Sequence, residues 1–221
     1  MLYSKVLKAA IVATGMLAAT SASAFASVVT LDFEGVRNFK PVGNFYNGGA
    51  GTNYGIQFSP ATLAAVDADA GGGGNFANEP SPNTVMFFLD SNNAILDVAA
   101  GFDTGFSFFY SSAKTASVNV YDGLGATGNL LATINLVAQY SQNCSGDPTG
   151  DYCNFSPIGV MFDGIAKSID FGGTANFIAF DDITLGSETP GSVSAVPLPA
   201  AAWLFGSALL GFAGFSKRRT A

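Results

Sequence analysis

The sequence predicts an all-β domain, an antiparallel β-sandwich or jelly roll, with an apolar segment at each end of the chain. Short runs of residues alternate between apolar and polar side chains. Gly, Asn, Ser and Asp separate these runs, and helical periodicity is hard to find. Ten or so short strands without crossover helices are typical of a sandwich or jelly roll.

The alternation is clearest in three segments. Val118 and Val120 alternate with polar neighbours, as do Ile169 and Phe171, and one parity of 130–136 is entirely apolar. The further strands expected from β-rich composition are 28–34, 55–59, 84–89, 94–98, 104–110, 157–162 and 175–185. A closed barrel in an outer membrane would need strands of about ten residues. We therefore favour the sandwich and assign it to residues 27–186.

Charge is unevenly distributed along the 221 residues, of which only 11% are charged. Residues 1–26 and 196–221 hold five of the nine bases and no acid, so residues 27–195 carry sixteen acids against four bases. This acidic middle excludes a nucleic-acid partner, because phosphate contacts need clusters of Lys and Arg. Histidine is absent, which excludes Ser-His-Asp and Cys-His nucleophilic sites and histidine-based metal sites.

Residues 1–26 have the parts of a secretory signal peptide. Lys5 and Lys8 precede a short apolar stretch, and two small-residue cleavage motifs follow, ending at Ala24 and Ala26. Signal peptidase is the expected partner, and the protein is expected to be exported. An N-terminal helix packed on the domain is the alternative, but the stretch has neither a polar face nor a cap.

The C-terminal segment 196–221 has three parts. They are Val196, Pro197, Leu198 and Pro199; the apolar run 200–215; and the basic residues Lys217, Arg218 and Arg219. As a helix, the run would be about 24 Å long, slightly less than the roughly 30 Å of a hydrocarbon core. We predict a transmembrane helix with the basic residues on the cytoplasmic side. The composition of 187–195 predicts a flexible linker before it.

The order and spacing of these three parts resemble the PEP-CTERM sorting signal of Gram-negative bacteria, in its VPLPA-type variant. Leu198 stands where the usual motif has Glu. The resemblance implies an exosortase-type sorting enzyme as a partner and membrane anchoring that is at least transient. It also implies a final place at the cell surface or in an exopolysaccharide matrix. The alternative is an ordinary C-terminal membrane anchor.

Two loops stand out in the middle of the chain. One contains Cys144 and Cys153, the only cysteines, which are nine positions apart. In an oxidising compartment they are expected to form a disulfide, with two free thiols as the alternative. The other loop, 67–75, is Gly-rich and is expected to be mobile. It begins like a calcium-binding EF-hand loop, but the position that should be Glu is Asn78.

Acidic residues gather in the first and last expected strands. Alternation places Asp32 and Glu34 on the polar face of the first strand and Asp182 on the polar face of the last. Asp181 would point inward, where a carboxylate needs a partner or a bulge. The ends of the domain resemble those of jelly rolls related to carbohydrate-binding modules, in which acids near both termini commonly hold a structural calcium. That resemblance implies calcium bound by Asp32, Glu34 and Asp182; the alternative is a solvated acidic face.

The remaining candidates concern ligand binding and catalysis. Tyr46, Tyr54, Tyr140 and Tyr152 fall in expected loops, where they would stack on a sugar ring or serve only as rim residues. Glycosidase chemistry needs two carboxylates at a fixed distance, which sixteen acids do not specify, and no G-x-S-x-G motif is present. We therefore expect a non-enzymatic structural or adhesive role in the envelope or exopolysaccharide. A calcium-stabilised, lectin-like carbohydrate-binding module is the second hypothesis, and a secreted hydrolase has the least support.

Overall fold

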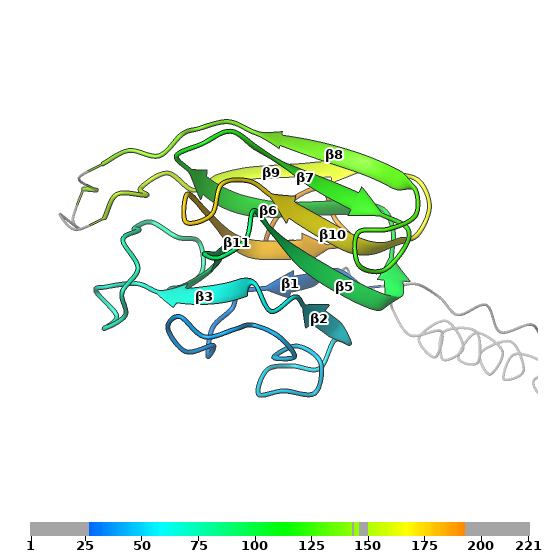
Figure 1. Cartoon of the computed structure of the whole chain (residues 1–221), viewed down its shortest axis with the longest axis horizontal. Helices are drawn as coiled ribbons and strands as arrows, with labels where there is room; N and C mark the ends of the chain where they lie inside the picture. The colour runs from blue at the N-terminus through cyan, green and yellow to red at the C-terminus, as the bar shows by residue number, and fades with distance from the viewer. Residues whose placement is uncertain (1–26, 143, 146–149, 193–221) are drawn as a thin grey trace, which may run out of the picture.

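Two antiparallel β-sheets face each other in the computed structural model, which describes residues 27–142, 144–145 and 150–192 (Figure 1). The strands are β1 (Val29–Leu31), β2 (Ile56–Phe58), β3 (Thr62–Val66), β4 (Thr84–Phe88), β5 (Asn93–Phe102), β6 (Gly105–Ser112), β7 (Ala116–Tyr121), β8 (Leu130–Leu136), β9 (Ser156–Met161), β10 (Ala166–Gly172) and β11 (Ile178–Leu185). Sheet A has the order β3-β4-β11-β6-β9, with β1 also paired to β11, and sheet B has the order β2-β5-β10-β7-β8. The predicted all-β architecture with two antiparallel sheets is confirmed.

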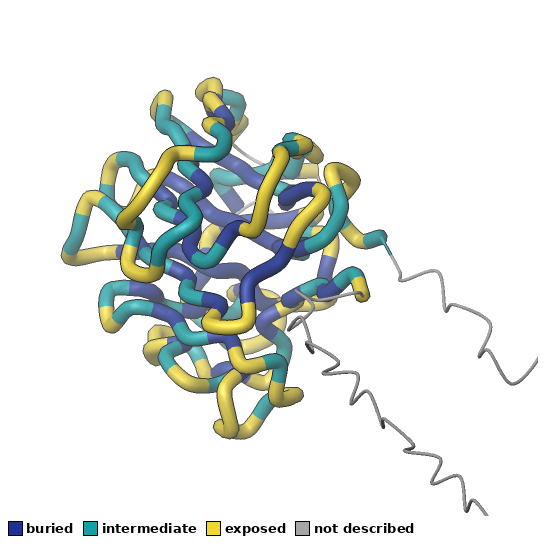
Figure 2. The backbone as a smooth tube through the Cα atoms, turned by 90° about the vertical axis from the view of Figure 1, so that its right-hand side faces the viewer, coloured by how far each residue is buried: buried dark blue, intermediate teal, exposed yellow. Residues whose placement is uncertain are grey.

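The core lies between the two sheets and is largely aromatic. Phe171 of β10 lies at its centre, with its ring centroid 5.0 Å from that of Phe180, 5.9 Å from that of Phe106 and 6.1 Å from that of Phe108. All four side chains are fully buried, and their rings meet edge to face, a favoured arrangement of aromatic pairs. Figure 2 shows buried backbone through the interior and exposed backbone mainly in the loops. Apolar side chains at alternate positions of both sheets therefore close the sandwich.

Strand β5 runs from Asn93 to Phe102 and is thus longer than the predicted 94–98. Two other strands also differ from the predictions. The first ends at Leu31 and not at residue 34, because Phe33 has a positive φ of 59° and turns the chain while its side chain stays buried. Asp32 and Glu34 therefore lie just beyond β1. Strand β3 was not predicted, because its sequence is rich in Ala, which has little strand preference.

A β-bulge in β11 changes the neighbour of that strand. The register with β6 shifts between Asp181 and Thr184, and Asp182 adopts a positive φ of 46° within the shift. Before the bulge β11 pairs with β4, and after it β11 pairs with β1. Asp181 was predicted to point inward, which can require a bulge, and the structure has both the buried side chain and the bulge.

The start of the expected linker, residues 187–192, is folded onto the domain. The Ser107 hydroxyl donates to the carbonyl of Ser187 at 2.9 Å, and the Gly191 amide donates to the hydroxyl of Thr184 at 3.0 Å. This segment is therefore held against the domain, whereas we expected a flexible linker from residue 187 onwards. Its backbone groups form hydrogen bonds with the hydroxyls of Ser107 in β6 and Thr184 in β11.

The predicted signal peptide with its cleavage sites at Ala24 and Ala26, the rest of the linker, and the C-terminal segment 196–221 lie outside the described residues. Those residues contain no helix that is long and apolar enough to span a membrane.

Candidate functional site

The two loops that stand out in the sequence meet at one end of the sandwich. The Gly-rich loop joins β3 to β4 and the cysteine-containing segment joins β8 to β9, and both lie at the left end of Figure 1. The carbonyl of Asn75 accepts hydrogen bonds from the amides of Asp151 at 2.7 Å and Tyr152 at 3.1 Å. We call the paired segments 74–77 and 151–154 the loop clasp.

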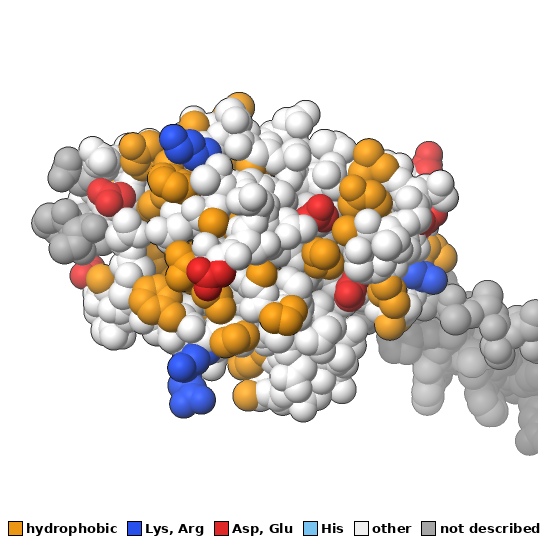
Figure 3. All heavy atoms as spheres, viewed as in Figure 1, with side chains coloured by type: hydrophobic (Ala, Val, Ile, Leu, Met, Phe, Trp, Pro, Cys, Tyr) orange, Lys and Arg blue, Asp and Glu red, His pale blue; other side chains and the backbone are white. Residues whose placement is uncertain are grey.

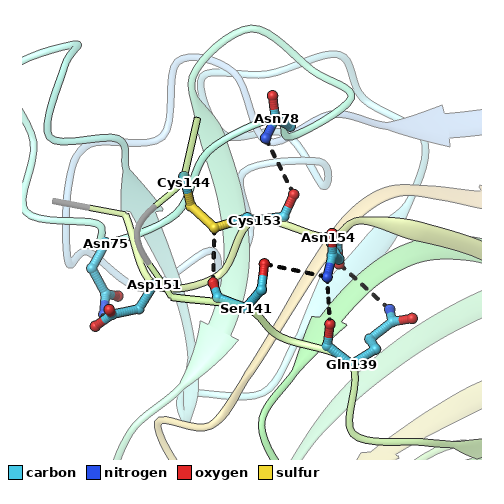
Figure 4. Close-up of a disulfide and its surroundings, with 8 residues drawn as sticks. All are labelled: Asn75, Asn78, Gln139, Ser141, Cys144, Asp151, Cys153 and Asn154. Carbon is cyan, nitrogen blue, oxygen red and sulfur yellow. Dashed lines mark hydrogen bonds between the residues drawn. A yellow bond between two sulfur atoms is a disulfide. The ribbon is translucent and has the colours of Figure 1, made fainter. Parts of the chain in front are cut away.

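The predicted disulfide between Cys144 and Cys153 is present and supports one side of the loop clasp (Figure 4). The side-chain amide of Asn78 donates to the carbonyl of Cys153 at 3.2 Å, which ties the disulfide to the Gly-rich loop. The side-chain amide of Asn154 donates to the carbonyl of Gln139 at 2.7 Å. Hydrogen bonds therefore hold Cys153 to the segment after the Gly-rich loop and Asn154 to the end of the chain that leaves β8.

Glycines in the Gly-rich loop allow close packing, in contrast to the mobile loop that we expected. A Cβ atom on Gly73 would lie 2.8 Å from a ring carbon of Phe39, and a Cβ on Gly74 would overlap the ring of Phe76. The amide of Gly74 donates to the carbonyl of Val66 at 2.8 Å. Gly is needed here because the backbone approaches two aromatic rings.

A groove of about 340 Å³ lies between the loop clasp and the outer face of sheet A. Aromatic side chains form much of its lining. Phe39 is half-exposed and meets Phe87 edge to face, with their ring centroids 5.9 Å apart. Phe76 and Tyr152 from the two loops complete the aromatic part. The volume is within the range of roughly 300–1,000 Å³ that is common for small-molecule sites.

Polar groups of the groove come from Asn75, Asn176 and Tyr152. The Tyr152 hydroxyl donates to the carbonyl of Asn176 at 3.4 Å, and the Asn75 amide donates to the carboxylate of Asp151 at 3.1 Å. The side-chain amide of Asn176 has no hydrogen bond to the described part of the chain, so it can donate to and accept from a ligand. None of the described side chains that line the groove is charged.

The four tyrosines named in the sequence have different places. Tyr140 and Tyr152 lie together at the clasp, with ring centroids 5.7 Å apart. Burial, followed by the neighbouring Tyr140 and Asp151, raises the pKa of Tyr152. Tyr46 is a core residue whose hydroxyl accepts from the Phe33 amide at 2.7 Å, so the interpretation of Tyr46 as a residue free to stack on sugar is wrong. The ring of Tyr54 stacks on that of Tyr46 and is only partly buried.

Phe39 and the two asparagines of the groove were not identified from the sequence. The only signal for Phe39 is an aromatic residue between two polar neighbours, Asn38 and Lys40. Asn75 and Asn176 are 101 positions apart, and only the pairing of the strands brings their loops to the same groove. Isolated polar residues in loops carry no such information.

A second group of polar residues surrounds Asp181, whose side chain is fully buried. Its carboxylate accepts from the amide of Ser81 at 2.8 Å and from the amide of Asp182 at 2.7 Å. These donors favour the charged carboxylate, but burial has the larger effect and raises the pKa of Asp181 to about 8.

The Ser81 hydroxyl lies within hydrogen-bonding distance of five oxygen atoms. They are Asp181 Oδ1 at 2.8 Å, Asp181 Oδ2 at 2.9 Å, the Asp32 carbonyl at 3.1 Å, the Thr84 carbonyl at 3.2 Å and Glu34 Oε1 at 3.5 Å. A hydroxyl has one proton, so it can donate to only one of these at a time. We call Ser81 and the four residues that supply these oxygens, Asp32, Glu34, Thr84 and Asp181, the carboxylate cluster. All the atoms with which this cluster could ligate a metal ion are oxygens, and oxygen is the ligand atom that calcium prefers.

The carboxylates of Asp32 and Glu34, two of the three residues predicted to bind calcium, accept hydrogen bonds from different donors. The Asp32 carboxylate accepts from the Tyr46 hydroxyl at 3.4 Å, and that of Glu34 accepts from the Asn83 amide at 2.8 Å. Burial, and then the charge of Asp32, raises the pKa of the half-buried Asp182. Within residues 27–142, 144–145 and 150–192, no three side chains of Asp, Glu, Cys or His form a group that could hold a metal ion. Calcium binding therefore stays a prediction. The predicted ligands did not include Asp181, which is the fully buried carboxylate of this region.

No family model matches this chain, and no curated protein matches it. Solved structures that are similar to this chain at low identity include the following three. The K2 cleaved adhesin domain of Lys-gingipain has 12% identity and a TM-score of 0.47, over 72% of this chain and 98% of that domain. The K3 cleaved adhesin domain of Lys-gingipain from Porphyromonas gingivalis has 17% identity and a TM-score of 0.39, over 73% and 100%. A carbohydrate-binding module of lichenase 5A from Cellvibrio mixtus, solved with cellotriose, has 15% identity and a TM-score of 0.36, over 59% and 89%.

Proposed function

We propose that the domain is a glycan-binding module with an adhesive role outside the cell, and that it binds without catalysing a reaction. The observation that carries this proposal is the groove at the loop clasp, where aromatic rings and the side-chain amides of Asn75 and Asn176 line the same space. A sugar ring has apolar C–H faces and a rim of hydroxyls. The exposed ring of Phe39 can pack against such a face, while Asn75 and Asn176 exchange hydrogen bonds with hydroxyls.

The surface around the groove suits a neutral polysaccharide better than a charged one. Figure 3 shows the side of the domain on which sheet B lies nearer the viewer, and charged side chains are few and well separated there. The described residues include four bases, and none of these lines the groove. The groove therefore offers shape, stacking and amide hydrogen bonds, which are the common means of recognising uncharged polar ligands.

The first experiment measures whether the full-length chain is retained by exopolysaccharide purified from its host. The chain is held in a detergent without a sugar headgroup, because such a headgroup would compete for the groove. We expect retention of the wild type and at least a tenfold loss for Phe39→Ala. Tyr121→Ala, which removes a partly buried ring from sheet B, is the matched control and should bind normally. Equal binding by both variants would contradict this site.

The proposed place of action is the outside of a Gram-negative cell. The secretory segment, the PEP-CTERM-like tail and the disulfide support export, because disulfides persist in oxidising compartments. We propose that signal peptidase and an exosortase-type enzyme process the chain. Mass spectrometry of the protein from its host tests this by locating both ends, and a mature form that retains residues 1–26 would contradict export.

We also propose that calcium stabilises the domain at the carboxylate cluster. Asp181 and Glu34 would supply carboxylates, and Asp32 and Thr84 would supply carbonyl oxygens. The Ser81 hydroxyl, which these oxygens surround, would turn away to make room for the ion, and the ion would neutralise the buried charge. Calcium should raise the melting temperature of the wild type and of Asp90→Asn, a control at an exposed acid, but not of Asp181→Asn. No shift in the wild type would end this proposal.

A further inference from the structure

The floor of the groove is made of small aliphatic side chains. Ala65 of β3 and Val85 of β4 are paired on the outer face of sheet A, and Ala179 of the next strand, β11, lies on the same face; each has less than a tenth of its surface exposed. They belong to a satellite hydrophobic cluster with Phe76 and Phe87, separate from the main core between the sheets. This floor offers no hydrogen bond to a hydroxyl.

The hydrogen-bonding groups of the groove lie elsewhere in its lining. They are the side chains of Asn75 and Asn176, supplied by the loops, and the hydroxyl of Tyr152. A ligand therefore meets polar groups contributed by the loops and only aliphatic side chains at the floor. Because no lining side chain is charged, a carboxylate on the ligand would lose water without gaining an ionic partner.

From this division we infer that the groove selects neutral sugars with a ring substituent that ends in a methyl group, such as acetamido sugars and 6-deoxy sugars; this inference rests on the proposed glycan-binding function. The methyl group would occupy the floor formed by Ala65, Val85 and Ala179. A hexose would place a hydroxyl there, and a hexuronic acid would place a carboxylate. One methyl-sized difference in an apolar pocket changes affinity by roughly 10- to 200-fold.

The test compares four free sugars as competitors for the retention of the full-length chain on host exopolysaccharide. They are an N-acetylhexosamine, a 6-deoxyhexose, the unmodified hexose and the hexuronic acid. Free sugars are used because a methyl glycoside would itself add a methyl group. We expect the two methyl-bearing sugars to compete at concentrations at least tenfold lower than the hexose, and the hexuronic acid to be the weakest.

The variant Ala65→Val fills the floor with two methyl groups, and Val suits a strand position. It should reduce the preference for methyl-bearing sugars to less than threefold. Ala99→Val, at an exposed position of β5, is the matched control and should keep the preference.

The possible outcomes distinguish a failure of the methyl selectivity from a failure of glycan binding itself. Competition by all neutral sugars with equal strength, or a preference that Ala65→Val leaves unchanged, would overturn the methyl selectivity and leave glycan binding intact. If the polysaccharide does not retain the chain and no sugar binds it in direct titration, the proposed function fails and the selectivity fails with it.

Discussion

The carboxylate cluster and the loop clasp both lie against sheet A, but they are built from different chemistry. The cluster has a fully buried carboxylate at its centre, and the chain segments next to β1, β4 and β11 meet there. The groove at the clasp is open, uncharged and lined by residues of two loops and the outer face of the sheet. The first arrangement holds strands together, and the second offers a surface to a ligand.

This difference separates stability from binding within one domain. Changes at the cluster should lower the free energy of unfolding and leave sugar selectivity unchanged in the protein that remains folded. Changes at the groove should alter binding with little effect on unfolding. The predictions below test this separation, beginning with the largest expected effect.

Replacing the buried carboxylate should have the largest effect. Asp181→Ala leaves the amides of Ser81 and Asp182 without their acceptor, and each unsatisfied buried group costs about 1–3 kcal/mol. We expect the free energy of unfolding, measured with urea, to fall by roughly 3 kcal/mol or more. Asp182→Ala, at a half-buried position, should lose less; equal losses would contradict the central place of Asp181.

Removing the disulfide should affect both properties. The double variant Cys144→Ser, Cys153→Ser should lose somewhat less than ~3 kcal/mol of unfolding free energy, because the bond closes a short loop. It should also lose affinity for the polysaccharide, because Tyr152 lies beside Cys153 in the loop clasp. Normal affinity in this double variant would show that the hydrogen bonds alone hold the clasp.

A methyl group on Gly74 should disturb the groove directly. Gly74→Ala places its Cβ in the ring of Phe76, and overpacking of this kind costs about 1–3 kcal/mol. Gly71→Ala is the control in the same loop: its Cβ meets open space, and its positive φ alone costs roughly 1–2 kcal/mol. We expect both to lower the melting temperature but only Gly74→Ala to reduce retention on the polysaccharide.

The buried carboxyl group also makes stability depend on pH when calcium is removed by a chelator. The folded pKa of Asp181, about 8, lies above the ordinary Asp value of 3.8, so its contribution is complete below pH 4 and is lost as the pH rises towards 8. The unfolding free energy should fall by up to about 1.4 kcal/mol per pH unit in this window. Asp181→Asn should remove most of this slope, and the rest belongs to Asp182, whose pKa is raised as well. A slope that this variant leaves unchanged would assign it to another group.

The smallest expected effect on stability is that of Phe39→Ala. Half of this side chain is exposed, and it contacts Phe87 at the surface, so the free energy of unfolding should change by less than about 1 kcal/mol. Urea unfolding of the variant checks this directly. A large loss of stability would mean that the reduced binding of this variant reports unfolding and not the loss of the ring.

The sequence predicted the strands well where alternation is strict, as in β7, β8 and β10, because one buried face fixes the pattern. It failed at β3, where Ala residues carry little preference, and at the end of β1, where Phe33 stays buried although the strand has ended. The buried position of Asp181 follows from parity. Its partner Ser81 is 100 residues away, and no local pattern indicates that contact.

The groove, too, depends on contacts between distant parts of the chain that no local pattern indicates. The glycines of loop 67–75 and the two cysteines were each visible in the sequence, and the disulfide itself was predicted. Their meeting was not predicted, because it depends on hydrogen bonds between Asn75 and residues that follow 76 or more positions later. Glycines expected to make the loop mobile instead let it pack against aromatic rings.

Hydrogen exchange of the full-length chain with and without host exopolysaccharide tests the central claim most directly. If the glycan occupies the groove, the amides of 74–77 and 151–154 should exchange more slowly in its presence. The amides of sheet B should be unchanged. Protection confined to sheet B, or equal protection in Phe39→Ala and the wild type, would contradict a glycan-binding site at the loop clasp.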